Sequence, residues 1–383
     1  MKSGRILHVI RPAEGGMKGH LLALAAGLQK SGYDIEVACP GDSSLTREIE
    51  DLGIAVHCID LVGPLNPKWD FRCVGQLRRI MQQGEYDIIH FHGAKAGLVG
   101  RLAAVFARCP RTVLTAHNFI IYDEVPLIKK ILFIYGEKLL SRFTTRIITV
   151  SEALKEDLVN KYRLTPGQII PIYNGIETAR FLEQRDKTGI RAELGVGQAK
   201  TVIGTMARMA PQKGLSYLLE AVALIKKRDS RAAGEIACVI AGDGPLRAEL
   251  TQQAQELGIE DIVRFPGFVH DVPGLLACLD IFVIPSIAEG LSITAIEAMA
   301  AGLPVAASRV GGLPELVAEG VTGCLVEPRN PSALAQTILQ MIDEPEKTRR
   351  MGEQGRTVAC RRFSTDAMIR NTCKVYDQVL TEK

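Results

Sequence analysis

The sequence lacks the patterns that most directly identify metal, redox or membrane proteins. Its nine cysteines are odd in number and contain no Cys-x-x-Cys pair, which favours reduced, buried thiols over zinc ligands or disulfides. The dinucleotide fingerprint Gly-x-Gly-x-x-Gly and the carboxylate pair Asp-x-Asp are both absent, so neither a nicotinamide cofactor nor a carboxylate-held metal ion is expected. No apolar run is long enough to span a membrane, and the run 6–10 is too short for a signal peptide. We therefore expect a soluble, cytoplasmic protein.

The composition that is present is typical of a globular protein with two domains. Hydrophobic residues make up 47% of the chain and charged residues 23%, and 383 residues exceed one ordinary domain. The net charge of +3 is uneven, because residues 1–180 hold 23 basic and 18 acidic side chains and the remainder holds 23 and 25. A mildly basic first half is compatible with an anionic acceptor or a membrane surface, but it is too weak to indicate nucleic acid.

The first half repeats a strand–turn–helix pattern. Residues 6–10 form a short apolar run, a turn with Gly15 and Gly16 follows, and residues 18–30 have helical periodicity before a second strand at 35–39. Such units build parallel sheets, which bind ligands at the carboxyl ends of their strands. The Gly15–Gly16 turn is therefore a candidate ligand site, although a simple turn explains it equally well.

Two histidines fall at the same predicted edge. The run 88–92 ends at His92 and the run 112–117 ends at His117. A lone histidine is more often structural than functional, but the carboxyl end of a parallel strand is where open α/β sheets place their sites.

Residues 127–146 alternate apolar residues with lysine and arginine. One interpretation is an amphipathic helix that touches anionic lipid. The other, which we prefer, is a helix packed on the core with only a basic edge in solvent.

The second half is organised around a strand, a loop and a helix. Residues 281–284 form a short apolar strand, and residues 293–301 are rich in strong helix formers, with Ser292 placed to act as N-cap. The loop between them carries Glu289 and Gly290.

This helix start suits a phosphate group. A helix that begins after Leu291 and Ser292 presents unpaired N–H groups and the positive end of its dipole, and Gly290 permits a close approach to the backbone. Carboxylates accept hydrogen bonds from sugar hydroxyls, so Glu297 is expected to hold a ribose and Glu289 to face a second sugar. The alternative is that both are solvated surface acids.

A second strand-to-helix turn carries two cations. Arg208 and Lys213 lie between a predicted strand at 201–206 and a helix at 215–226. Either alone is usually a surface charge, but together they suit a diphosphate, because guanidinium and ammonium groups form charge-assisted hydrogen bonds with phosphate.

Together these motifs resemble those of retaining nucleotide-sugar glycosyltransferases of family 4. The resemblance rests on the Glu289-x7-Glu297 spacing, on the run 297–308 and on the Arg208–Lys213 loop, in which Ala207 replaces the usual glycine. Gly290-Leu291-Ser292 stands where the family normally has Gly-Phe-Gly, and Ala116-His117-Asn118 and Asn174-Gly175 resemble further family segments.

The resemblance implies the GT-B architecture, with two Rossmann-like parallel-sheet domains facing a cleft. We expect an acceptor-side domain at 1–176, a linker at 177–200, a donor-side domain at 201–360, and a helix at 361–383 that crosses back to the first domain.

The resemblance also implies the roles of individual residues. His117, Arg208, Lys213 and Glu289 are the expected catalytic residues: two cations for the departing diphosphate, Glu289 for the donor hydroxyls and His117 for the sugar. His92 is expected on the acceptor side. The expected donor-binding residues are Gly15, Gly16, Asn174, Arg208, Lys213, Asp243, Val269, Glu289, Gly290, Leu291, Ser292 and Glu297.

The implied activity is transfer of a sugar from a UDP- or GDP-sugar to a saccharide or lipid-linked acceptor, with retention and without a metal or other cofactor. Synthesis of cell-surface polysaccharide or glycolipid is the expected setting, with peripheral contact of the first domain with the inner membrane. A nucleotide-sugar epimerase of the same architecture and a noncatalytic sugar-nucleotide-binding protein remain as alternatives, whereas a dinucleotide oxidoreductase is disfavoured by the missing fingerprint.

Overall fold

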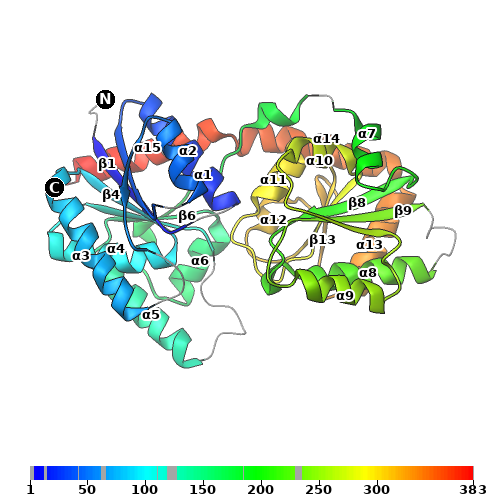
Figure 1. Ribbon diagram of the computed structural model, residues 1–383, viewed down its shortest axis with the longest axis horizontal. Helices are drawn as coiled ribbons and strands as arrows, with labels where there is room; N and C mark the ends of the chain where they lie inside the picture. Colours follow the sequence, from blue (N-terminus) through cyan, green and yellow to red (C-terminus); the bar gives the residue numbers. More distant parts are fainter. Residues whose placement is uncertain are drawn as a thin grey trace. The chain divides into compact units, whose positions relative to one another are not determined.

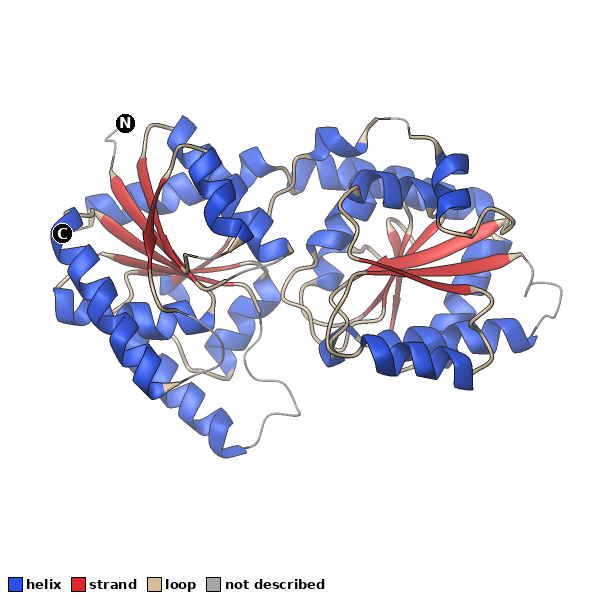
Figure 2. Cartoon of the chain, viewed as in Figure 1, coloured by secondary structure: helices blue, strands red, loops and turns tan. Residues whose placement is uncertain are grey.

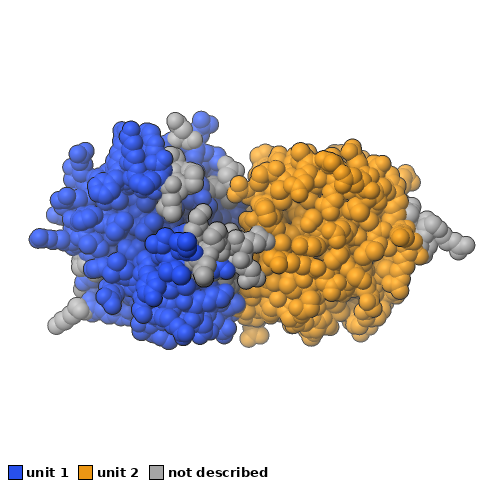
Figure 3. Space-filling view, turned by 90° about the horizontal axis from the view of Figure 1, so that it is seen from below, with its two compact units in different colours: residues 1–175, 365–383 blue, residues 176–364 orange. Residues whose placement is uncertain are grey.

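The chain forms two compact units, which Figure 3 colours separately. Unit 1 holds Met1–Gly175 and Thr365–Lys383, and unit 2 holds Ile176–Ser364. The structure is a computed structural model that describes residues 4–12, 15–41, 43–61, 66–109, 111–118, 127–183, 185–228 and 235–382. In each unit, helices cover both faces of a parallel sheet (Figure 2), which confirms the predicted fold class of two Rossmann-like domains.

Unit 1 is built on a seven-stranded sheet with the order β3-β2-β1-β4-β5-β6-β7, in which neighbouring strands pair in parallel. Strands buried on both faces need continuous apolar runs, which explains why the strands near 6–10, 35–39, 88–92 and 112–117 were recognisable in the sequence. The strands are β1 (Arg5–Ile10), β2 (Asp34–Cys39), β3 (Ala55–Cys58), β4 (Ile88–His92), β5 (Thr112–Ala116), β6 (Arg146–Thr149) and β7 (Ile169–Pro171).

Two hydrophobic clusters cover the two faces of this sheet. One is formed with α1 (Gly16–Lys30), α2 (Ser44–Asp51) and the chain's last helix, α15 (Thr365–Thr381). The other is formed with α3 (Pro67–Gly84), α4 (Ala94–Ala107) and α6 (Glu152–Asn160). The 3₁₀ turn η1 (Pro166–Gln168) precedes β7.

Helix α5 (Leu127–Ser141) lies outside α4, as Figure 1 shows at the lower left. Phe133 and Ile134 pack against the cluster that includes α4. Ile128, Leu132 and Tyr135, in contrast, are 75%, 68% and 68% exposed. The preferred interpretation of 127–146, a core-packed helix with a solvated basic edge, therefore holds for the packed side, but it omitted the apolar side chains that also face solvent. The alternation of residue types did not reveal that the helix has more apolar surface than the core can cover.

Unit 2 is built on a six-stranded parallel sheet with the order β10-β9-β8-β11-β12-β13. Its strands are β8 (Thr201–Met206), β9 (Ile236–Ala241), β10 (Val263–Gly267), β11 (Ile281–Ile284), β12 (Val305–Ser308) and β13 (Gly323–Val326). One face packs on α8 (Leu215–Arg228), α9 (Arg247–Glu256) and α13 (Pro331–Asp343). The remaining elements are η2 (Thr178–Phe181), α7 (Lys187–Glu193), η3 (Pro211–Lys213), α10 (Val272–Cys278), α11 (Ile293–Ala300), α12 (Leu313–Leu316) and α14 (Pro345–Arg362).

Residues 177–200, for which the sequence predicted a linker, contain η2 and α7 and belong to unit 2. Arg191 Nη2 lies 2.5 Å from Asp280 Oδ2, and Lys187 Nζ lies 2.7 Å from Asp280 Oδ1. Ion pairs thus help to dock a segment that has little apolar periodicity, and the missing periodicity is why it resembled a linker. The final helix begins at Thr365, because residues up to Arg362 continue α14.

Each sheet has one point, which we call its switch point, at which the chain reverses the direction in which strands are added. In unit 1 it lies between β1 and β4, where α1 leaves toward one face and α4 toward the other. In unit 2 it lies between β8 and β11. Loops that leave such a point in opposite directions open a crevice at the carboxyl ends of the strands, where α/β sheets bind ligands.

Candidate functional site

An ion pair between Lys213 and Glu289 occupies the switch point of unit 2. Lys213 Nζ lies 2.5 Å from Glu289 Oε2, and Ser286 Oγ donates to the same carboxylate oxygen at 3.3 Å. Glu289 is only 6% exposed, so its charge depends on these partners. Lys213 follows β8 and Glu289 follows β11, and these strands are neighbours. The sheet order therefore joins two residues that are 76 positions apart.

Backbone contacts hold the two loops together. The N–H groups of Ile287 and Ala288 both donate to the carbonyl oxygen of Gln212, at 2.9 and 3.3 Å. Gly214 has φ +62°, and a Cβ there would lie 2.1 Å from the carbonyl oxygen of Pro285. A side chain at position 214 would push the loops apart, so glycine is required for this close approach.

The start of α11 lies beside this pair. Ser292 Oγ accepts a hydrogen bond from Ala295 N at 3.2 Å, which confirms its predicted role as N-cap. A small cavity is lined by Lys213, Glu289, Ser292 and Thr294. Gly290 and Leu291 connect Glu289 to the cap and are buried with it. The positive end of α11 and the Lys213 ammonium thus converge where the sequence predicted a diphosphate.

Glu297 is half-buried in the first turns of α11. Burial raises the pKa of its carboxyl group to about 7, and the nearby Arg180 guanidinium opposes that rise. A carboxyl group that titrates near neutrality can donate to or accept from a hydroxyl group. This property fits the predicted contact with a ribose.

The other predicted donor residues are distributed along the same sheet edge. Arg208 is exposed on the loop after β8 and has no ion pair within the described ranges. The Asp243 carbonyl oxygen accepts from Met209 N at 2.9 Å, which brings the loop after β9 beside that of Arg208. Val269 follows β10 at the edge of the sheet, two strands from β8, and its contact with the donor stays a prediction.

At the switch point of unit 1 the structure assembles a histidine cluster, formed by His8, His20, His90, His92 and His117. The ring centroids of His20 and His117 are 4.7 Å apart, and those of His92 and His117 are 5.7 Å apart. His92 and His117, both predicted site residues, therefore lie together. The chain has seven histidines, so five of them meet at one edge.

Three members of the cluster make hydrogen bonds through their rings. His8 Nδ1 and His92 Nε2 share a hydrogen bond of 2.9 Å. His90 lies between Tyr376 of α15, at 2.6 Å from Nδ1, and Thr115, at 2.7 Å from Nε2. These contacts fix the orientation of three of the five buried rings.

Burial keeps the imidazoles neutral. It lowers the pKa of His8 to about 3 and that of His20 to about 4, and the neighbouring Asn174 amide opposes the change at His20. Burial also lowers the pKa of the other three members well below the usual value, and the neighbouring histidines act in the same direction. Unit 1 thus offers uncharged donors and acceptors.

Several of these buried atoms have no hydrogen-bond partner among the residues that the structure describes: His92 Nδ1, His117 Nε2, both ring nitrogens of His20, and Asn174 Oδ1. Unpaired buried polar atoms are costly, so they indicate a polar ligand that would satisfy them. Asn174, predicted on the donor side, is 3% exposed in unit 1.

Gly15, the N-cap of α1, has φ +62° and open space around its Cβ position, and Gly16 begins the helix.

Three of these imidazoles also have a spacing that suits a metal ion. The ligating nitrogen atoms of His20, His92 and His117 lie within 4.8 Å of one another, and neutral imidazoles are good ligands for zinc-like ions. The sequence predicted no metal site, and that stays a prediction.

His8, His20 and His90 also belong to the cluster, and they were not predicted as site residues. His90 precedes His92 by two residues, so both side chains lie on the same face of β4. His20 lies about one turn into α1, close to the Gly15–Gly16 turn. The spacing of His90 and His92 and the position of His20 near the glycine turn were both visible in the sequence. The strand order was needed to show that these histidines lie together.

Comparisons with known proteins agree across both units. The family model for glycosyl transferases group 1 matches residues 186–358, and the model for Glycosyltransferase Family 4 matches residues 14–180. The D-inositol 3-phosphate glycosyltransferase of Corynebacterium efficiens is 30% identical, with 96% of this chain and 91% of the relative covered. The UDP-Gal:alpha-D-GlcNAc-diphosphoundecaprenol alpha-1,3-galactosyltransferase of Escherichia coli is 27% identical, with 89% and 88% covered.

Among solved structures, Anabaena Alr3699/HepE in complex with UDP and glucose is similar with a TM-score of 0.85 and 25% identity, covering 98% of this chain and 100% of that one. The same protein has also been solved in complex with UDP-glucose. The chain therefore belongs to glycosyltransferase family 4 and is a glycosyltransferase with the GT-B fold.

Proposed function

We propose that this glycosyltransferase moves a sugar from a nucleoside diphosphate sugar to a saccharide or lipid-linked acceptor, with retention of anomeric configuration and without a metal ion. The observation that carries the proposal is the Lys213–Glu289 pair beside the N-terminus of α11. It places a cation, backbone N–H groups and a carboxylate at one switch point, and these groups match a diphosphate joined to a sugar.

The predicted catalytic residues, together with Glu297 and His92, each have a chemical task in this proposal. Lys213, Arg208 and the start of α11 stabilise the charge that develops on the departing diphosphate, at about 2.7–4 kcal/mol for a well-placed donor. Glu289 exchanges part of its contact with Lys213 for the hydroxyl groups of the donor sugar, and Glu297 holds the ribose. On unit 1, His117 contacts the transferred sugar and His92 the acceptor, both as neutral hydrogen-bonding groups.

Retention follows in the proposal from a front-face reaction. Glu289 is paired with Lys213 and Ser286, so it is placed to orient a sugar and is poorly suited to form a covalent intermediate. The departing diphosphate then accepts the acceptor's proton as the new glycosidic bond forms on the same face. The proton and the broken bond's electron pair both end on the nucleotide, so the step balances without a cofactor.

The nature of donor and acceptor is supported by the similar proteins. The structural neighbour HepE binds UDP and glucose, so a UDP-sugar is the first donor to test, before GDP-sugars. The E. coli relative acts on a diphosphoundecaprenol-linked sugar, which supports a lipid-linked acceptor and a role in polysaccharide or glycolipid synthesis. Peripheral contact of unit 1 with a membrane is part of this proposal.

Product analysis with labelled donors tests it. The enzyme is incubated with UDP- and GDP-sugars and with diphosphoundecaprenol-linked or soluble saccharides, in the presence and absence of a chelator. A glycosylated acceptor whose new bond keeps the donor's configuration by NMR supports the proposal. A product with inverted configuration would contradict retention, and a loss of activity with the chelator would contradict metal independence. An epimerised donor would show that the protein is a different enzyme.

A further inference from the structure

Unit 1 has an exposed apolar stripe along α5. Ile128, Leu132, Tyr135 and Leu139 are each more than half exposed, and they recur at intervals of three or four residues. Side chains with this spacing lie on one side of a helix. Phe143, just beyond the helix, is 50% exposed and extends the stripe.

Helix α4 widens this stripe into a surface. Its residues Leu102, Val105 and Phe106 are also exposed, and α4 contacts α5. We call the exposed apolar side chains of these two helices, together with Phe143, the α4–α5 face. Exposed apolar side chains that gather on neighbouring helices mark an interaction site more often than single exposed residues do.

The charged side chains described in solvent at the C-terminal end of α5 are basic. Lys138 and Arg142 are exposed: Lys138 lies beside the apolar stripe on α5, and Arg142 follows the C-terminal end of that helix. Glu137, the acid of α5, lies on the opposite side of the helix, where its carboxylate makes two hydrogen bonds of 2.7 Å to the buried Arg101. The acid is thus neutralised inside the protein while the bases remain in solvent.

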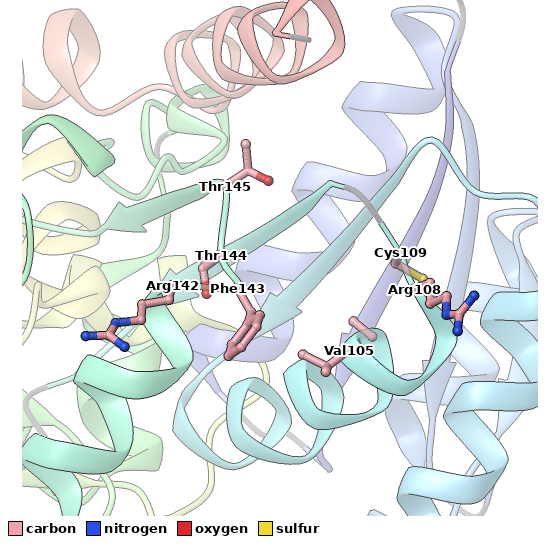
Figure 4. A pocket seen from close by; sticks show the side chains of 8 residues that line it. Val105, Arg108, Cys109, Arg142, Phe143, Thr144 and Thr145 are labelled. Atoms are coloured by element: carbon pink, nitrogen blue, oxygen red, sulfur yellow. The ribbon is translucent and has the colours of Figure 1, made fainter.

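Figure 4 shows a hollow at one end of this face, between α4 and the turn that follows α5. Arg108 and Arg142 lie at opposite ends of it, with Phe143 and Val105 between them. The hollow encloses about 410 Å³. Two guanidinium groups with apolar side chains between them suit a lipid surface, in which phosphates lie just outside the acyl chains.

We propose that the α4–α5 face docks on a bilayer that contains anionic phospholipid, with the apolar stripe in the headgroup–acyl boundary and Arg108, Lys138 and Arg142 on lipid phosphates. Amphipathic helices with basic flanks bind membranes in this way. No described helix is long and apolar enough to cross a membrane, so the contact is with one surface. A second copy of the chain is a poorer occupant, because a symmetric pairing would bring the same cations together.

This inference rests on the membrane contact in the proposed function and deepens it, but it does not require the transfer reaction. Vesicle flotation tests it with the full chain, using phosphatidylcholine vesicles with and without phosphatidylglycerol. The wild type should float only with the anionic vesicles, and added salt should weaken the binding. Lys138→Glu/Arg142→Glu should reduce the partition coefficient at least tenfold, as expected when two surface cations are lost. Leu132→Ser/Tyr135→Ser should also reduce it, even at low salt.

A matched control is available on α15, which packs on the other face of the same sheet. Arg370 and Lys374 are exposed and have the same four-residue spacing as the α5 pair. Arg370→Glu/Lys374→Glu makes the same change in net charge and should leave the partition coefficient within about twofold of wild type. Equal losses in the two double variants would overturn the docking face, because net charge alone would then explain binding.

The outcome also separates this inference from the proposed function. If the wild type does not float but its melting temperature still rises with UDP-sugar, the lipid face is wrong and the transferase proposal stands. If the wild type is a dimer and Leu132→Ser/Tyr135→Ser makes it monomeric, a second copy covers the face and the inference is overturned. Loss of flotation with an unchanged UDP-sugar shift supports it and excludes misfolding as the cause.

Discussion

Units 1 and 2 share a parallel sheet with a switch point, yet the two edges have different chemistry. Unit 1 gathers five buried, neutral imidazoles, whereas unit 2 places a buried carboxylate against a lysine and a capped helix start. The common backbone provides the location, because loops diverge there in both units. The side chains decide the ligand: uncharged hydrogen-bonding groups suit sugar hydroxyls, and fixed positive charge suits a diphosphate.

The largest expected difference between the two units is in how their stability changes when the pH is lowered. The pKa values of His8 and His20, about 3 and 4, lie below the usual value near 6.5, so the unfolded chain binds protons that unit 1 excludes. Unit 1 should therefore lose stability as the pH falls below about 6.5, at roughly 1.4 kcal/mol per pH unit for each such histidine. Glu297, with a pKa raised to about 7, acts oppositely: its stabilisation of unit 2 is full below about pH 4.5 and is lost as the pH rises through 7.

Hydrogen exchange at pH 7 and pH 5 measures this difference, with each rate converted to an opening free energy. In the wild type, the opening free energy of peptides from β1 and β4 should fall at pH 5, and that of peptides from α11 should rise. Glu297→Gln should abolish the rise in α11. If β1 and β4 keep their opening free energy at pH 5, the histidines are not held neutral by burial.

Lys213→Ala should lower turnover by about 10²–10³, because it removes a preorganised donor to the leaving diphosphate. It should also destabilise unit 2 by about 3 kcal/mol, since the buried Glu289 carboxylate loses its cation. Lys213→Ala/Glu289→Gln should recover most of that stability without recovering turnover. Initial rates and urea unfolding distinguish the two effects, and near-normal turnover in the single variant would rule out the leaving-group role.

Gly214 and Gly15 provide a pair with the same φ of +62° in different surroundings. Alanine at position 214 costs about 1–2 kcal/mol for the left-handed backbone, and alanine at position 15 is also strained, because φ +62° is combined there with ψ −134°. At position 214 the added Cβ would also lie 2.1 Å from the Pro285 carbonyl oxygen, whereas at position 15 it meets open space. Gly214→Ala should therefore lower the melting temperature further than Gly15→Ala and abolish the rise caused by UDP. Equal effects would show that the close contact between the loops does not shape the donor site.

The smallest expected effect concerns two helix caps. Ser292 caps α11 in unit 2 and Ser151 caps α6 in unit 1, each accepting a backbone hydrogen bond of 3.2 Å. Replacement of either by alanine should cost about 1 kcal/mol of stability. Only Ser292→Ala should also weaken UDP binding in a calorimetric titration. A similar loss of affinity with Ser151→Ala would mean that the effect arises from stability alone.

The local architecture could be predicted because its signals lie close together in the sequence. The strand at 281–284, the cap at Ser292 and the helix after it are specified within twenty residues. The Arg208–Lys213 turn was found for the same reason. Short-range apolar runs and capping residues therefore determined the fold class and much of the donor loop.

The contacts that complete the site depend on distant residues and could not be predicted. Glu289 was expected to face only a sugar, but its partner Lys213 comes from a strand that becomes adjacent through the sheet order. His90 is held by Tyr376, 286 residues away. Helix α5 was misjudged because an apolar pattern shows that a face exists, whereas burial depends on what packs against it.

A crystal structure of the enzyme with a UDP-sugar tests the central claim most directly. We predict diphosphate oxygens within hydrogen-bond distance of Lys213 Nζ and of the first N–H groups of α11, with the ribose hydroxyls on Glu297. A nucleotide bound with its diphosphate on the histidine cluster of unit 1, or away from the β8–β11 switch point, would contradict the account.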